Sequence, residues 1–151
     1  MNWYRHRGAT LWSIGATAVL IVGCGGGNTQ DSLRAGVRMA PIAQMPLEVQ
    51  RAPVSVREAY QFVTAHVDAL RQVPCYCGCG AMGHTSITSC YVSDSAAGGD
   101  ATSFDAHALG CSICVDIARD AMRLMQQGSD VAAIPGYVDA SYARYGPSNI
   151  Q

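Results

Sequence analysis

Hydrophobic residues recur at helical spacing in three segments of the chain. The first covers residues 56–73, where apolar side chains return every three or four positions until Pro74 ends the pattern. Ser55, followed three residues later by Glu58, forms a capping box that predicts the start of this helix. The predicted inward stripe consists of Ala59, Phe62, Val63, His66, Val67, Leu70 and Val73.

Two more helices are predicted in the C-terminal part of the chain. The second covers residues 107–128 and is closed by Gly128; its inward positions are Cys111, Cys114, Ala118, Ala121, Met122 and Met125. The third can be capped by Ser129 or Asp130 and tolerates Pro135 in its first turn. Its apolar side comprises Tyr137, Val138, Ser141, Tyr142 and Tyr145.

A loop-rich stretch over residues 75–104 separates the first two helices and holds most of the cysteines. Within it, residues 93–103 are polar and rich in alanine and glycine, so we expect a mobile surface loop there. The pattern predicts a mainly α fold, namely a small single domain of about three helices around a Cys-rich loop. A metal ion or disulfides would stabilise that loop.

The N-terminus has the shape of a signal peptide. Arg5, His6 and Arg7 precede an apolar run over residues 8–22, which is too short for a typical transmembrane helix. The run ends in Ile21-Val22-Gly23-Cys24, which resembles a bacterial lipobox and implies cleavage before a lipidated Cys24. We therefore expect a lipoprotein signal peptide over residues 1–23, a flexible tether over 24–53 and a Cys-rich helical domain over 54–151, lipid-anchored outside the cytoplasm of a bacterium.

Composition narrows the classes of function. The 151 residues include ten arginines, no lysine and eleven acidic residues, so there is no basic surface for nucleic acid. The chain has no paired-carboxylate motif, no Gly-x-Ser-x-Gly and no phosphate-binding glycine loop followed by lysine. These absences disfavour hydrolysis and phosphoryl transfer, and we expect a protein that is not an enzyme.

The cysteines fall into two groups with different geometry. Cys75, Cys77 and Cys79 alternate with other residues, and extended neighbours would lie about 6.6 Å apart, at the upper limit for a disulfide. Gly78 and Gly80 permit positive φ, so the segment can curl and direct its sulfurs at one centre, which favours a metal. Cys111 and Cys114 have helical i, i+3 spacing near a helix N-terminus. The macrodipole lowers thiol pKa there, and both sulfurs can reach one ion or each other.

With Cys90, three cysteines face three others across the loop. One solution is a set of disulfides, with fifteen possible connectivities. The other is a thiolate site for one or two soft ions, Cu(I) or zinc, which His84 and His107 are placed to complete. Zinc favours four ligands and would leave some cysteines unused, so copper, or a pair of ions, ranks first.

Several spaced motifs together resemble a known family. They are Pro74-Cys75-Tyr76-Cys77-Gly78-Cys79, Gly83-His84, Cys90-Tyr91-Val92 and Cys111-Ser112-Ile113-Cys114-Val115-Asp116. Over residues 56–146 the chain resembles the PCYCGC-motif lipoproteins, a bacterial, membrane-anchored family, and departs from them at Ile134-Pro135-Gly136. The resemblance implies extracytoplasmic placement and a shared site built from Cys75, Cys77, Cys79, His84, Cys90, Cys111 and Cys114.

The leading hypothesis is a membrane-anchored lipoprotein that binds copper or zinc for storage, delivery or detoxification. The membrane contact would be the lipid on Cys24, and a metal donor or acceptor protein would be its partner. Thiol-disulfide exchange by Cys111 and Cys114 is an alternative, although no strand pattern supplies the βαβ context of a thioredoxin-like pair. A disulfide-stapled interaction module without chemistry of its own is the third.

Overall fold

A computed structural model describes residues 37–93 and 103–150. Its α-helices are α2 (Leu47–Arg51), α3 (Val54–Ala65), α4 (Val67–Leu70), α5 (Ser112–Gln126) and α6 (Ile134–Tyr142). Short 3-10 turns are η1 (Ile42–Gln44), η2 (Cys79–Met82), η3 (Thr88–Cys90), η5 (His107–Leu109), η6 (Val131–Ala133) and η7 (Ala143–Tyr145). The only β pairing within these residues is a bridge between Val92 and Phe104. The mainly helical small domain expected from the sequence is confirmed.

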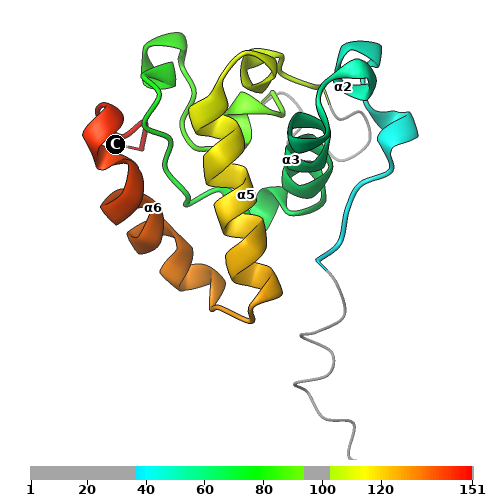
Figure 1. Ribbon diagram of the computed structural model, residues 1–151. Coiled ribbons are helices and arrows are strands. Elements are labelled where there is room, and N and C mark those ends of the chain that lie inside the picture. The colour runs from blue at the N-terminus through cyan, green and yellow to red at the C-terminus, as the bar shows by residue number, and fades with distance from the viewer. Residues whose placement is uncertain (1–36, 94–102, 151) are drawn as a thin grey trace, which may run out of the picture.

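Three helices form the body of the domain. In Figure 1, α5 runs through the middle, with α3 on one side and α6 on the other, and α5 packs against both. The loop between α4 and α5 lies across the upper part of this layer, beside the C-terminal segment. Among the described helices, none combines the length and the apolar character that crossing a membrane requires.

The core is formed mainly by the facing sides of α3 and α5. Two tyrosines lie at its centre: the rings of Tyr60 and Tyr91 meet edge to face with their centroids 4.8 Å apart. Both are fully buried, and each hydroxyl donates to a backbone carbonyl of the loop region or of α5. The remaining buried side chains of the two helices are Val56, Ala59, Phe62, Val63, Cys114, Val115, Ile117, Ala118 and Ala121.

The first helix differs from the sequence expectation at both ends. It begins at Val54, directly after Pro53, with no side-chain cap, so the predicted capping box is wrong. It is also interrupted, because His66 leaves the helical region with φ −132° and ψ 26°. There the imidazole packs against Phe62, and its Nε2 lies 3.1 Å from the carbonyl oxygen of Arg38. Helix α4 then continues the chain as far as Leu70.

The expectation of a flexible tether over residues 24–53 is wrong for its second half. Turn η1 and helix α2 occupy this stretch, and Met45 and Val49, four positions apart, are only 3% and 1% exposed. Each of the three prolines in the segment directly precedes a helical element and is the cap residue of η1, α2 or α3. Residues 24–36, Cys24 included, lie outside the described residues, as does the signal peptide.

The C-terminal elements largely match their predictions. The chain forms η5 first and starts α5 only at Ser112, later than expected. Gly128 follows α5 with φ 78°. Asp130 caps η6, accepting a hydrogen bond from the backbone N of Ala132 at 3.0 Å. Pro135 lies in the first turn of α6, where no intrahelical N–H is needed. Most of the expected surface loop, residues 94–102, lies outside the described residues.

Candidate metal centre

Three sulfurs form a triangle above the N-terminus of α5. The Sγ atom of Cys75 lies 3.4 Å from that of Cys77 and 3.5 Å from that of Cys114, and the Cys77–Cys114 separation is 3.6 Å. Sulfurs of a disulfide would lie about 2.05 Å apart. At M–S distances of about 2.3 Å, tetrahedral zinc holds its sulfurs about 3.8 Å apart. The observed spacing is therefore close to that of metal ligands, and all six described cysteines are free.

The PCYCGC segment curls as its glycines suggest, although only one of them uses positive φ. Gly78 adopts φ 83° and turns the chain into η2, which begins at Cys79. Gly80 does not use the positive φ that glycine permits. After this turn Cys79 is buried, and its Sγ lies 3.6 Å from that of Cys90.

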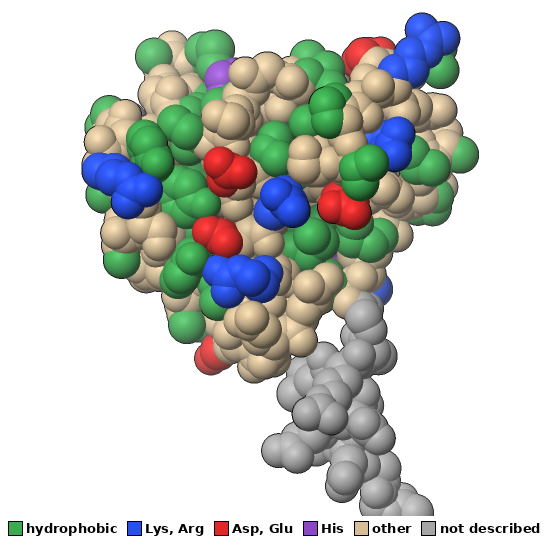
Figure 2. Space-filling model, in the orientation of Figure 1, with side chains coloured by type: hydrophobic (Ala, Val, Ile, Leu, Met, Phe, Trp, Pro, Cys, Tyr) green, Lys and Arg blue, Asp and Glu red, His purple; other side chains and the backbone are tan. Residues whose placement is uncertain are grey.

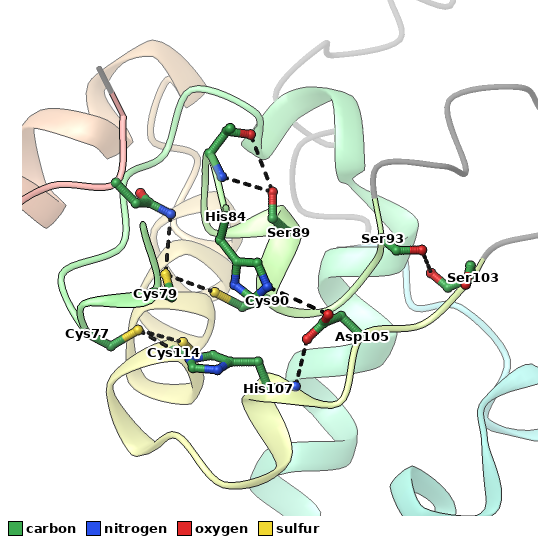
Figure 3. A network of polar contacts seen from close by, with 12 residues as sticks. Cys77, Cys79, His84, Ser89, Cys90, Ser93, Ser103, Asp105, His107 and Cys114 are labelled. Atoms are coloured by element: carbon green, nitrogen blue, oxygen red, sulfur yellow. Dashed lines mark hydrogen bonds and ion pairs between the residues drawn. The ribbon is translucent and has the colours of Figure 1, made fainter. Parts of the chain in front are cut away.

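Two histidines, His84 and His107, lie beside the sulfurs. The Nε2 atom of His107 lies 3.3 Å from the Sγ of Cys77, and the His84 and His107 rings meet edge to face with their centroids 5.2 Å apart. Figure 3 shows His84 directed at Cys90, with its Nε2 facing Asp105 Oδ2 at 3.6 Å. Its Nδ1 is buried and has no hydrogen-bond partner. An unpaired buried nitrogen beside free thiols is suited to a metal ion.

Within the described residues, the ligand atoms form three overlapping sets whose members all lie within 4.8 Å of one another. These sets are Cys75, Cys77, Cys79 and Cys90; Cys77, Cys90, His107 and Cys114; and Cys79, His84, Cys90 and His107. They bring together seven of the eight ligands expected from the sequence. Cys111 belongs to none of them; it is the half-buried cap residue of α5.

The thiols do not ionise alike. Hydrogen bonds from Cys75 and Cys90 lower the pKa of Cys114 to about 6. The pKa of Cys90 is raised, chiefly by its hydrogen bonds to Cys114 and Cys75, and that of Cys77 by burial and by the charge of Cys114. Without a metal, these shifts favour a thiolate at Cys114 and protonated thiols at Cys77 and Cys90. Binding of an ion would release protons from those thiols.

Two residues that the sequence analysis missed position the ligands. Asp105 accepts a hydrogen bond from the backbone N of His107 at 2.7 Å while its other carboxylate oxygen faces His84. The sequence signal was its place two residues before His107, the spacing of an Asx turn. The backbone carbonyl of Asp105 accepts a hydrogen bond from the Tyr60 hydroxyl at 2.7 Å, which fixes the backbone of Asp105 against α3.

The second missed residue, Asn149, clamps the PCYCGC segment from the C-terminal side. Its Oδ1 accepts from the backbone N of Cys75 at 2.7 Å, and its Nδ2 donates to the Sγ of Cys79 at 3.4 Å. Its own backbone N donates to the carbonyl of Cys75 at 3.1 Å. No local pattern could reveal this role, because Asn149 follows Cys75 by 74 residues.

A surface cavity of about 720 Å³ borders the centre on the side of His84. His84 and Asn149 line it together with Arg71, Gly80, Thr85 and Ser148. The face drawn in Figure 2 shows acidic and basic side chains interspersed, without a large area of one charge.

Comparison with known proteins gives one match. The model of a family described as "Protein of unknown function with PCYCGC motif" matches residues 15–149. No curated protein and no solved structure matches the chain.

Proposed function

Because this chain belongs to the PCYCGC-motif family, whose description assigns no activity, we propose its function from the site itself. The domain binds a soft metal ion, copper(I) first and zinc second, through its Cys/His cluster. Thiolate and imidazole ligands select these ions over magnesium or calcium, which prefer oxygen.

One observation carries this proposal: five thiol sulfurs and two imidazoles converge while all the described cysteines remain free. Packing alone does not require so many soft donors at metal-ligand spacing. Four of the sulfurs, those of Cys75, Cys79, Cys90 and Cys114, belong to buried residues. A buried thiolate is costly without a compensating cation, so an ion would stabilise both the charge and the loop.

We propose that the centre operates outside the cytoplasm, attached to a bacterial membrane through lipid on Cys24. The lipobox-like sequence before Cys24 supports this placement. A tethered metal site suits storage, delivery or detoxification at the membrane, with a metal donor or acceptor protein as its partner. None of these roles requires a catalytic residue.

A competitive Cu(I) titration tests the proposal. The full chain is purified in detergent, reduced and free of oxygen, and titrated against a chromogenic Cu(I) chelator, with a parallel zinc titration. Tight binding is expected in wild type and should be lost in the Cys75→Ser/Cys77→Ser variant. Cys111→Ser is the matched control, because Cys111 lies outside the ligand sets and serine is a good helix cap. A folded, reduced wild-type chain that binds neither ion overturns the proposal.

Thiol-disulfide exchange is the second candidate. The low pKa of Cys114, about 6, favours it, and the nearest sulfur of a possible disulfide partner is that of Cys75 at 3.5 Å. Access opposes it, because both side chains are fully buried, whereas reactive thiols are usually exposed. Disulfide mapping after equilibration in glutathione buffers tests this candidate. A Cys75–Cys114 disulfide that forms and breaks reversibly near the buffer potential would support it.

A further inference from the structure

We propose that the centre holds two ions joined by the thiolate of Cys90, an inner ion bound by sulfur alone and an outer ion bound by two sulfurs and two imidazoles. This inference rests on the proposed function. Its first support is that Cys90 is common to all three ligand sets.

The inner position is defined by four sulfurs. Cys75, Cys77 and Cys114 form the triangle with 3.4 to 3.6 Å sides. The sulfur of Cys90 lies within 4.8 Å of each corner, because Cys90 shares one ligand set with Cys75 and Cys77 and another with Cys77 and Cys114. An ion between the triangle and Cys90 would have four thiolate ligands, the arrangement of closed structural sites.

The outer position uses the three remaining ligands together with Cys90, which it shares with the inner position. Cys79, His84, Cys90 and His107 offer ligand atoms that all lie within 4.8 Å of one another. Only this set employs His84, whose buried Nδ1 is otherwise unpartnered. Asp105 faces the Nε2 of His84, an arrangement in which a carboxylate orients a metal-bound imidazole.

The two positions together account for every converging donor. They use seven ligands and overlap only at Cys90, whereas a single tetrahedral ion would leave three donors unused. Charge points the same way. Five thiolates carry five negative charges. One Cu(I) ion leaves four of them uncompensated and two leave three, while one zinc ion leaves three and two leave one. Since uncompensated charge inside a protein is costly, the second ion stabilises the fully loaded centre.

The two positions differ in access. Three of the four inner ligands are fully buried, and only Cys77 is partly exposed. At the outer position His84 lines the surface cavity, where its side chain is 12% exposed. The outer ion therefore exchanges with solvent or a partner first, and the inner ion leaves more slowly.

Cadmium NMR of the full chain tests this arrangement. The reduced protein in detergent is loaded with ¹¹³Cd²⁺, a soft ion that accepts the same ligands. Two resonances of equal area are expected, with the four-sulfur site further downfield. Each should be split by the other ion, because ions that share a thiolate are coupled through its sulfur. The His84→Ala/His107→Ala variant should keep the downfield resonance alone, now unsplit, while Cys111→Ser should match wild type. Far-UV circular dichroism verifies that each variant is folded.

The outcomes separate this inference from the proposed function. One bound ion per folded wild-type chain overturns the two-ion inference and leaves metal binding intact. Two resonances without mutual splitting overturn the bridge. Loss of the four-sulfur resonance in the folded double-histidine variant overturns the assignment of ligands. No bound ion overturns both proposals.

Discussion

Replacing Asn149 with alanine tests whether the C-terminal segment holds the centre together. The substitution removes the Oδ1 acceptor of the Cys75 backbone N–H and the Nδ2 donor to the Cys79 sulfur. Cys75 is fully buried, so its N–H group has no ready access to water as a replacement partner. Figure 1 shows the C-terminal segment beside the loop that it would release.

The size of the effect follows from these two contacts. An unsatisfied buried N–H costs about 1–3 kcal/mol, and a lost hydrogen bond adds about 1 kcal/mol. We therefore expect Asn149→Ala to lower the free energy of unfolding of the metal-free domain by about 2–4 kcal/mol. A hydrogen bond to a charged group contributes about 1.5–3 kcal/mol, so ion affinity should also fall by about tenfold to a hundredfold.

Urea unfolding of the reduced, metal-free protein, followed by circular dichroism, measures the first quantity, and the chelator competition measures the second. Ser148→Ala is the matched control because Ser148 is an exposed neighbour whose hydroxyl contacts the backbone N of Ile150 and the Tyr76 side chain, neither of which is a hydrogen-bond partner of Asn149 in the clamp. A loss of stability below about 0.5 kcal/mol for Asn149→Ala, the range of ordinary surface substitutions, would refute the clamp.

Three further results are expected. Tyr91→Phe should cost about 1–3 kcal/mol in urea unfolding, because it leaves the buried carbonyl of Cys114 without its 2.7 Å hydrogen bond, whereas the exposed Tyr145→Phe should change little. A chain that begins after α2 should lose about 3–6 kcal/mol relative to one that begins at residue 37, since the buried Met45 and Val49 are removed; equal stabilities would mean that η1 and α2 are dispensable. In the metal-free protein, unfolding free energy should rise from pH 6 to pH 9, because Cys114, with a pKa of about 6, has lost a proton that the unfolded state still holds. It should fall above pH 9, where neighbouring thiols of raised pKa keep protons that the unfolded state releases, and a flat profile would contradict both shifts.

The local part of the fold could be predicted from the sequence. The periodic apolar positions gave α3 and α5, and Asp130 and Pro135 marked the start of the last helical segment. The errors arose where tertiary contacts outweigh local preference. His66 interrupts the first helix where its ring packs on Phe62 and its Nε2 lies 3.1 Å from the carbonyl oxygen of Arg38, in the segment before η1. Helix α2 has only five residues between Pro46 and Pro53, too few for its buried positions to show a helical period in the sequence.

The candidate site, too, was predicted from the sequence only in part. Cysteine and histidine spacing indicated the right residue types, and the structure brings seven of the eight predicted ligands together. Spacing could not show that Cys114 is a candidate ligand and Cys111 is not, because both lie near the N-terminus of α5. Only the packing of the domain directs Cys114 toward Cys75. Asp105 and Asn149 carry no ligand signature, since they act through hydrogen bonds to ligand residues.

The position of Asn149 also orders events during biosynthesis. Synthesis proceeds from the N-terminus, and so would the export that the proposed placement requires, so every proposed ligand, from Cys75 to Cys114, emerges before the residue that clamps the first of them. The emerging domain thus passes through a stage in which its thiols are present but the C-terminal segment that carries Asn149 is not yet docked against them. At that stage an oxidant could trap a wrong disulfide, and a metal could enter without displacing the clamp. The time between synthesis of Cys114 and docking of Asn149 is therefore the interval in which a thiol-protecting chaperone would matter most.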